Sequence, residues 1–307
     1  MISAAACGKI ILFGEHAVVY GRPAIAVPVT QVQATALVQP RAHGLTIHAT
    51  DIARTVKVEP HNLIDPLAAI VNLTLAYLNC PRPQLEITVH STIPIASGLG
   101  SGAAISTAIV RALAQFAGRP DIAPEVVSQL VYEVEKLYHG TPSGIDNTVI
   151  AYQQPVYFLR GEPIQTFNVA HPFTVVVGNT GIASSTKKAV SDVRRGWEID
   201  PARYEAWFDW IGAIVQQARS AIEAGTLDRL GPLLDQNHVL LRELDVSSLE
   251  LERLILAAKQ AGASGAKLVG GGRGGNMIAL VNDQQREAVI AALKEAGAVN
   301  VLVTEIQ

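Results

Sequence analysis

The sequence has few cysteines, no excess of either charge and no long apolar run. Cys7 and Cys80 are the two cysteines among 307 residues, and they form neither a disulfide framework nor the spacing of a zinc site. We therefore expect a reducing, cytoplasmic environment. The 24 basic and 27 acidic residues leave a net charge of −3, so we expect no nucleic acid and no anionic membrane as a partner. An anionic small substrate stays open, because a few local cations can hold it.

We also expect neither a membrane span nor a secretory signal. No run of about 18 apolar residues occurs, so we expect no membrane-spanning helix. The short apolar stretch at the N-terminus is interrupted by Lys9 and followed by Glu15 and His16, which is unlike a signal peptide.

The composition is that of a folded protein, with 49% hydrophobic and 17% charged residues. At roughly 100–200 residues per domain, the length allows two domains. Alternation and apolar runs predict strands at 9–13, 24–29, 34–38, 45–48, 55–58, 85–92, 156–159 and 173–178. Helical periodicity predicts helices at 66–79, from the loop at 98–102 to about 116, and at 124–138.

The predicted order of helices and strands changes in the second half of the chain. Three successive helices are predicted at 201–225, 226–243 and 247–261. A strand at 266–269, a glycine-rich segment, a strand at 277–281, a helix at 284–296 and a strand at 299–304 follow. This order predicts two α+β lobes, with a boundary near 165–180.

A glycine-rich loop at 98–103 (GLGSGA) lies between a predicted strand and a predicted helix. Its glycines let backbone N–H groups face an anion closely, and the helix N-terminus adds partial positive charge, so a triphosphate fits. The dinucleotide pattern G-x-G-x-x-A also matches, but Pro94 separates the strand from the glycines and no acidic residue follows about 20 positions on. The lysine of a P-loop is absent too. A tight turn with a helix cap is the alternative.

A second glycine cluster, residues 270–275 (GGGRGG), follows the strand at 266–269. Five glycines around Arg273 indicate a backbone that must approach something closely. A flexible hairpin is the alternative, and Arg273 either holds phosphate or is solvated.

Charged residues inside apolar segments are the candidates for chemistry. Lys9, in a hydrophobic strand, is either an edge residue whose amine reaches solvent or a buried functional ammonium. Glu15 and His16 interrupt the apolar segment 13–21, or they form an exposed pair in a loop.

Two carboxylates near the end of the helix at 124–138 are further candidates. Asp146 follows a turn held by proline and glycines, and Glu135 stands eleven residues earlier. One carboxylate could take Mg²⁺ while the other handles a proton. The alternatives are a cap for Asp146, and Lys136 or solvent as the partner of Glu135.

Taken together, the segments resemble the motifs of the GHMP kinases, in their mevalonate kinase form. Residues 8–21 (GKIILFGEHAVVYG) resemble the first motif, 94–104 (PIASGLGSGAA) the phosphate loop P-x-x-x-G-L-G-S-S-A-A, and 267–276 (KLVGGGRGGN) the third, glycine-rich motif. Residues 139–147 (HGTPSGIDN) are similar to H-G-x-P-S-G-x-D-N of mevalonate kinases, and 179–188 and 234–241 resemble two further segments. The resemblance runs in order from Gly8 to about Leu280.

The resemblance implies an ATP-dependent kinase that phosphorylates the primary hydroxyl of mevalonate, giving 5-phosphomevalonate and ADP for isoprenoid synthesis. It implies a two-lobed α+β fold, with a lobe at 1–170 related to ribosomal protein S5 domain 2 and a ferredoxin-like lobe at 171–307. ATP and Mg²⁺ would be the cofactors, and a homodimer is an expected assembly.

The resemblance also assigns residues. Asp146 would be the base and Lys9 the cation that lowers the pKa of the hydroxyl. Glu15, His16 and Thr186 would contact the substrate. Ser101 and Glu135 would bind the metal. The ATP phosphates would lie on Pro94, Ser97, Gly98, Leu99, Gly100, Ser101, Gly102 and Ala103.

Some positions depart from the family pattern. Gly102 stands where the phosphate loop has its second serine, a metal or phosphate ligand. Arg273 and Asn276 are unusual in the third motif. Ser184 replaces a basic residue that contacts the substrate carboxylate in some mevalonate kinases, so the partner of that carboxylate stays open. Lys187, Lys188 and Arg273 are candidates by charge.

Other functions remain as rivals. Within the family these are kinases for phosphomevalonate or a sugar and a related ATP-dependent decarboxylase. Outside it they are a non-catalytic sensor on the same fold and a nicotinamide oxidoreductase. Galactokinases typically have Gly-Glu-His-Thr-Asp-Tyr, which differs from the segment at 14–19. Lys9, Glu135 and Asp146 argue against a sensor.

Overall fold

A computed structural model describes residues 1–94, 98–139 and 142–307, with no side-chain placement for 138 and 139. The residues group into two compact units. Unit 1 comprises Met1–Lys9, Val32–Ile95 and Leu99–Gln153, and unit 2 comprises Ile10–Gln31, Ala96–Gly98 and Gln154–Gln307. The strands β1 (Ile2–Phe13) and β2 (Ala24–Pro40) each run through both units.

Unit 1 contains a mixed sheet. Its strands follow the order β4 (Arg54–Lys57), β3 (Leu45–Ala49), β5 (Leu85–Ser91), β2, and β1 pairs with β2. The β3–β5 pair is parallel, while β2 runs antiparallel to β5, with Ala36 opposite Val89. From Val32 onward β2 mostly alternates between buried and more exposed residues, as a sheet with one covered face requires.

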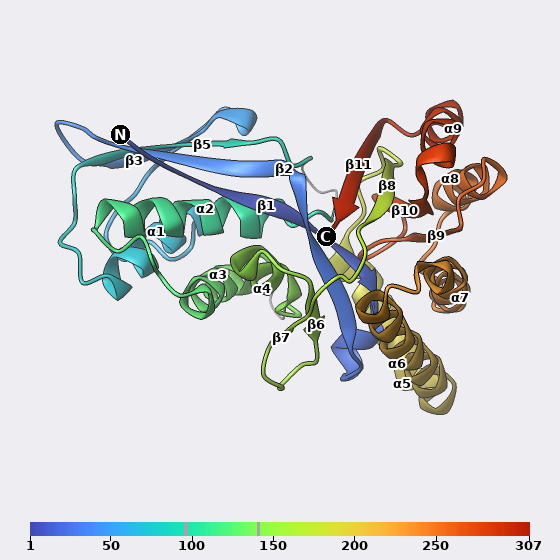
Figure 1. The fold of residues 1–307 in the computed structure, drawn as a ribbon. Coiled ribbons are helices and arrows are strands. Elements are labelled where there is room, and N and C mark those ends of the chain that lie inside the picture. Colours follow the sequence, from blue (N-terminus) through green and yellow to red (C-terminus); the bar gives the residue numbers. More distant parts are fainter. Residues whose placement is uncertain (95–97, 140–141) are drawn as a thin grey trace. The chain divides into compact units, whose positions relative to one another are not determined.

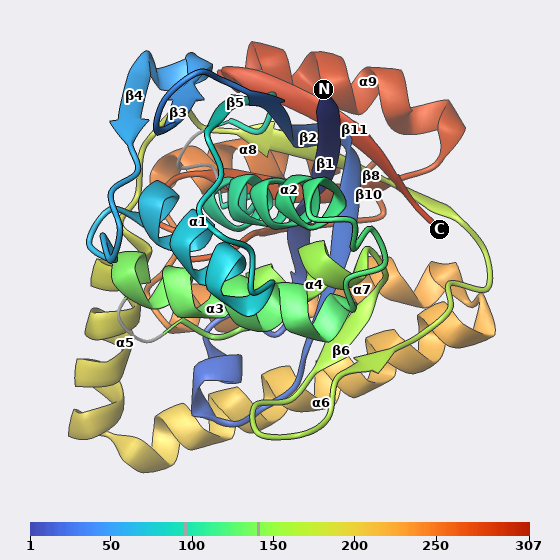
Figure 2. The same ribbon diagram turned by 90° about the vertical axis from the view of Figure 1, so that its left-hand side faces the viewer.

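Helices cover one face of this sheet. Figure 1 shows α1 (Pro66–Tyr77) and α2 (Ser101–Phe116) beneath the strands, with α3 (Pro124–His139) and α4 (Ile145–Tyr152) packed against them, and Figure 2 gives the perpendicular view. Asp65 caps α1 by accepting from the N–H groups of Leu67 and Ala68, and Pro66 occupies the first helical position. The alanine-rich α2 buries much of its surface, which fixes the direction of its N-terminus.

Unit 2 has an antiparallel sheet in the order β11 (Asn300–Ile306), β8 (Phe173–Asn179), β10 (Asn276–Val281), β9 (Gly265–Leu268). In chain order this is the 4-1-3-2 arrangement of a ferredoxin-like fold, which confirms the predicted C-terminal architecture. Figure 1 shows α8 (Leu249–Gln260) and α9 (Asp283–Glu295) on one face of the sheet.

The remaining elements connect these layers. Unit 2 also holds α5 (Thr186–Ile199), α6 (Pro201–Ala224), α7 (Leu230–Glu243) and the short strands β6 (Val156–Phe158) and β7 (Gln165–Thr166). Strand β6 pairs with the first residues of β2, Ala26 lying opposite Val156. Short 3₁₀ helices occur at η1 (Ala17–Tyr20), η2 (Thr50–Ile52) and η3 (Leu227–Arg229).

The structure differs from the sequence prediction at particular elements. The two strands predicted at 24–29 and 34–38 form one strand, and β1 begins at Ile2 instead of Lys9. Helices α4 and α5 were not predicted. The lobes at 1–170 and 171–307 remain a prediction.

No helix in the described part of the chain is both long and apolar enough to cross a membrane.

Candidate active site

Lys9 lies at the centre of a charged cluster in unit 1. Its side chain is 4% exposed, and its Nζ lies 2.9 Å from Oδ1 of Asp146. The Lys9 N–H donates to the carbonyl of Leu99 at 3.0 Å, which ties strand β1 to the glycine loop. A buried ammonium is stable only with such a partner, so the ion pair accounts for a lysine inside an apolar strand. Of the two alternatives for Lys9, the structure selects the buried ammonium.

Asp146 is placed by a turn and a helix together. Gly144 has a φ of 92° and is followed at once by α4, so Asp146 stands in the first turn of that helix. The partial positive charge of the helix N-terminus favours a carboxylate there. The side chain of Asp146 is 30% exposed, which leaves it accessible while one of its oxygens contacts Lys9.

The glycine loop passes directly over Lys9. Gly100 is the N-cap of α2, with a φ of 76° that an L side chain rarely adopts. A Cβ at Gly100 would lie 3.0 Å from Cγ of Lys9 and 2.9 Å from Cδ1 of Ile150. Glycine is therefore required here by close packing as well as by the backbone angle. The first N–H groups of α2, starting at Ser101, have no acceptor within the helix and point out of its N-terminal end, which is the geometry that the predicted phosphate site requires.

Glu135 lies beside this loop. It is 4% exposed, and a Cβ built on Gly102 would lie 3.4 Å from its Oε1. Burial raises the pKa of Glu135 to about 7, the charge of Asp146 adds to this shift, and Lys9 opposes it. Lys136, the alternative partner, instead pairs with Glu133. A buried carboxylate next to a phosphate-type loop is suited to holding a hard cation.

A second charged cluster lies in unit 2, where Glu15 is paired with Lys267. The Nζ of Lys267 donates to Oε1 of Glu15 and, at 2.7 Å, to the carbonyl of Leu268. Both side chains are buried, Lys267 completely so. Burial lowers the pKa of Lys267, and the Glu15 carboxylate opposes that shift. The pair joins segments that are 252 residues apart in the sequence.

His16 adopts a strained backbone next to this pair. Its φ of 61° and ψ of −52°, with the Ala17 N–H donating to the Glu15 carbonyl at 2.7 Å, define a rare γ-turn. Its Nε2 lies 3.2 Å from the carbonyl oxygen of Gly271. Because a carbonyl can only accept, Nε2 carries the proton and Nδ1 is left as an acceptor. Burial lowers the pKa of His16 to about 4, against the opposing bond to Gly271, so the imidazole is neutral at physiological pH.

The second glycine cluster, residues 270–275, packs closely against other residues of unit 2. A Cβ at Gly272 would lie 1.9 Å from the carbonyl oxygen of Val246, and one at Gly271 would lie 2.9 Å from Oγ1 of Thr186. Ser184 Oγ donates to the carbonyl of Gly272. The backbone of residues 270–275 does make the predicted close approach. The atoms that it approaches belong to the protein itself, in Val246 and Thr186.

The family follows from comparison with known proteins. A model of the GHMP kinase N-terminal domain matches residues 65–154, and a model of the GHMP kinase C-terminal domain matches residues 218–299. The chain belongs to the GHMP kinase family.

Individual GHMP kinases are similar over almost their whole length. The mevalonate kinase of Thermococcus sibiricus is 35% identical, over 96% of this chain and 93% of that protein. The mevalonate kinase of Pyrococcus abyssi is 36% identical, over 97% and 93%. The crystal structure of L. major mevalonate kinase in complex with R-mevalonate matches with a TM-score of 0.85 and 31% identity, covering 99% of this chain and 95% of that one.

Where this GHMP kinase departs from the family pattern, the structure gives local reasons. At Gly102, a Cβ would lie in ordinary contact with Glu135, 3.4 Å from its Oε1. Arg273 is engaged by Asp192 and Asp245 instead of being solvated. Ser184 is engaged by Gly272.

Other predicted residues are placed as follows. Thr186 begins α5 and is exposed, and Ser101 begins α2. Leu99 is buried, while Pro94, Gly98 and Ala103 lie along the loop and the first turn of α2. Ser97 is outside the described residues. The roles assigned to these residues stay predictions.

Sequence reasoning missed Lys267 as a site residue. The available signal was the one used for Lys9, a lysine within a short apolar strand.

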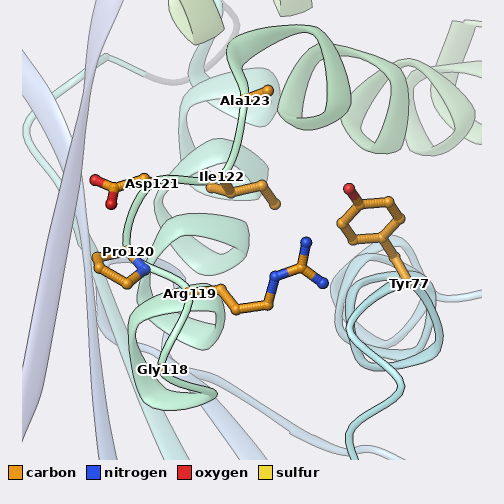
Figure 3. Close-up of a pocket in the computed structure, with 7 residues that line it drawn as sticks. All are labelled: Tyr77, Gly118, Arg119, Pro120, Asp121, Ile122 and Ala123. Atoms are coloured by element: carbon orange, nitrogen blue, oxygen red, sulfur yellow. The ribbon is translucent and has the colours of Figure 1, made fainter.

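A surface hollow of about 300 Å³ lies elsewhere in unit 1. Figure 3 shows Arg119 extending toward the ring of Tyr77, and its guanidinium carbon lies 5.6 Å from the ring centroid. The hollow is lined by the residues that follow the C-terminus of α2, while the glycine loop precedes its N-terminus. Since α2 has 16 residues, its ends are separated by about 24 Å. The hollow is therefore separate from the candidate site.

Proposed function

We propose that this chain is a kinase that transfers the γ-phosphoryl group of ATP to the primary hydroxyl of mevalonate, giving 5-phosphomevalonate and ADP. The observation that carries the proposal is the ion pair between the accessible Asp146 and the buried Lys9, whose side chain packs against Gly100 of the glycine loop. The full-length similarity to mevalonate kinases supports mevalonate as the substrate.

Asp146 is the base in the proposed mechanism. A primary alcohol is a poor nucleophile at neutral pH, and a carboxylate at hydrogen-bond distance can take its proton as the new bond forms. The alcohol oxygen then bonds to the γ-phosphorus, the bond to the β–γ bridging oxygen breaks, and ADP leaves. Lys9 holds Asp146 in place and stabilises negative charge on the attacking oxygen.

The loop and Glu135 serve the phosphates. The backbone N–H groups at the N-terminus of α2 can donate to phosphate oxygens, and this needs no charged side chain. Glu135 and Ser101 would hold Mg²⁺, which when bound would supply positive charge to the phosphate groups. Oxygen donors suit this ion, and Mg²⁺ typically completes its shell with water and phosphate. This agrees with the described residues, among which no group of three or more His, Cys, Asp or Glu converges into a metal cage.

The substrate is oriented by His16, Glu15 and Thr186 in this proposal. Neutral His16 offers Nδ1 as an acceptor, because its Nε2–H is used by Gly271. Glu15 accepts a hydrogen bond from Lys267 and lies next to His16 in the sequence. In this proposal it contacts the substrate next to His16. We also propose a cytoplasmic location and a homodimer, the latter testable by light scattering on a sizing column.

The direct test is Asp146→Asn in an assay for mevalonate-dependent ADP release. We expect kcat to fall by about 10²–10⁴-fold, the usual contribution of a general base, with ATP binding largely retained. Asp283→Asn is the matched control, because Asp283 also stands in the first turn of a helix and is exposed. Near-normal turnover by folded Asp146→Asn would overturn the assignment of the base.

A further inference from the structure

Arg273 interrupts the glycines of the third motif in a conformation that favours glycine. Its φ is 57°, in the left-handed region. A side chain placed there at a cost in backbone strain needs a compensating role. The guanidinium supplies one through contacts to two separate segments of unit 2.

The contacts of Arg273 use all of its guanidinium nitrogens. Nη1 donates to the carboxylate of Asp192 in α5, Nη2 lies 3.2 Å from Oδ2 of Asp245, and Nε donates to the Asp245 carbonyl at 3.0 Å. The backbone N–H of Arg273 also donates to Val246 at 2.7 Å. The side chains of Arg273 and Asp192 are 29% and 23% exposed, so this pair is partly shielded from solvent, while Asp245 is 93% exposed. Arginine suits this role, because a lysine has no fork to reach several acceptors at once.

These contacts fix the segment that holds His16. Gly271, two residues before Arg273, presents its carbonyl oxygen to Nε2 of His16. The γ-turn at His16 is strained, and such turns persist only when their surroundings hold them. The position of the Gly271 carbonyl is therefore part of what holds the imidazole.

We propose that Arg273 is a positioning residue, which clamps the glycine segment to α5 and to the turn at Asp245 so that the Gly271 carbonyl orients His16 for substrate binding. Its effect on catalysis rests on the proposed function, whereas its effect on His16 does not. The clamp engages Nε, Nη1 and Nη2 of Arg273 in one contact each within the protein.

The test compares Arg273→Gly and Asp192→Asn with Arg286→Ala. Glycine accepts the left-handed backbone, so the first variant removes the clamp without adding strain. Arg286 is a partly exposed arginine of α9 paired with Asp283 and Glu287, and it controls for the loss of one positive charge. Circular dichroism verifies the fold of each variant.

Nitrogen NMR on histidine-labelled protein, with His16→Gln to assign the signals, reports the tautomer of His16. In the wild type and in Arg286→Ala we expect a single form protonated at Nε2. In Arg273→Gly and Asp192→Asn we expect a mixture of tautomers. The KM for mevalonate should rise about tenfold in these two variants, the effect of losing one hydrogen bond, with kcat and the KM for ATP nearly unchanged.

The outcomes separate the two proposals. An unchanged His16 tautomer in Arg273→Gly overturns the clamp, whatever the activity. A changed tautomer with an unchanged KM for mevalonate overturns its role in substrate binding. If the wild type fails to phosphorylate mevalonate while the tautomer responds to Arg273→Gly, the clamp stands and the proposed function is wrong.

Discussion

At the scale of single residues, buried charge is the main feature of the candidate site. Lys9 and Lys267 are both almost fully buried, and each is compensated by one carboxylate. Removing one partner of a buried pair leaves a charge that costs several kcal/mol, so these positions tolerate few substitutions. Glu135 differs from them, because its burial raises its pKa to about 7.

The raised pKa of Glu135 makes stability depend on pH in a definite direction. Between its ordinary value of 4.5 and about 7, the folded protein holds a proton that the unfolded chain has lost. The free energy of unfolding therefore falls as pH rises through this window, and above it the buried charge costs about 3 kcal/mol. Bound Mg²⁺ would offset this cost.

Glu135→Gln tests this argument. The amide cannot ionise, so in the absence of Mg²⁺ the variant should unfold at a higher temperature than the wild type at pH 8, and at nearly the same temperature at pH 5. Its kinase activity should be strongly reduced at both pH values. The exposed Glu133→Gln, on the same helix, is the control and should shift neither. Equal pH dependence in Glu135→Gln and the wild type would contradict the expected titration.

At the scale of elements, helix α2 has a left-handed glycine at each end. Gly100 precedes it with a φ of 76°, and Gly118 follows it with a φ of 74°. A Cβ at Gly118 meets no described atom within 4 Å, whereas one at Gly100 collides with Lys9 and Ile150. The two positions impose the same backbone strain on an alanine, and they differ in what the new methyl group displaces.

Gly100→Ala and Gly118→Ala therefore form a matched pair. Each should lose about 1 kcal/mol of stability from the left-handed backbone. Gly100→Ala should in addition lower kcat by at least about tenfold, because a small displacement of a catalytic group such as Lys9 is costly. Gly118→Ala should keep wild-type kinetics. Steady-state kinetics and thermal unfolding on both variants make the comparison, and equal kinetics in the two would remove Gly100 from the site.

Helix α5 shows where prediction of elements from the sequence reaches its limit. It buries only Ala189 and Val193 fully, and more than half of its residues are polar or charged, so it has few of the apolar residues that marked the other helices in the sequence. Its N-cap, Ser185, was an available signal. The alanine-rich α2 was predicted with nearly the observed bounds, because most of its residues are apolar or small and buried.

At the scale of the whole molecule, local pattern and long-range contact were not equally predictable. The glycine segments, Lys9, Glu135 and Asp146 stood out because charge or glycine in an apolar context is a local signal. The partner of Glu15 did not, because Lys267 is 252 residues away in the sequence and meets Glu15 only in the folded unit. Likewise, the sequence predicted a close approach at residues 270–275 and could not tell that Val246 and Thr186 are the neighbours.

The charges of the residues assigned to the site lead to a prediction about substrate preference. Phosphomevalonate carries about two more negative charges than mevalonate at neutral pH. Unit 1 supplies one ammonium, Lys9, against the carboxylates of Asp146 and Glu135. In unit 2 the charge of Lys267 is compensated by Glu15, and His16, with a pKa of about 4, is neutral.

None of these groups offers a free cation for an added phosphate, and an uncompensated buried charge costs several kcal/mol. The neutral CH₂OH of mevalonate meets no such penalty. We therefore expect kcat/KM for mevalonate to exceed that for phosphomevalonate by at least about tenfold, a difference of about 1.4 kcal/mol, and the similarity to mevalonate kinases leads us to expect the same margin over galactose. Side-by-side measurement of the three alcohols with the same enzyme preparation decides this, and a tenfold preference for either rival would leave only the kinase fold and its family standing.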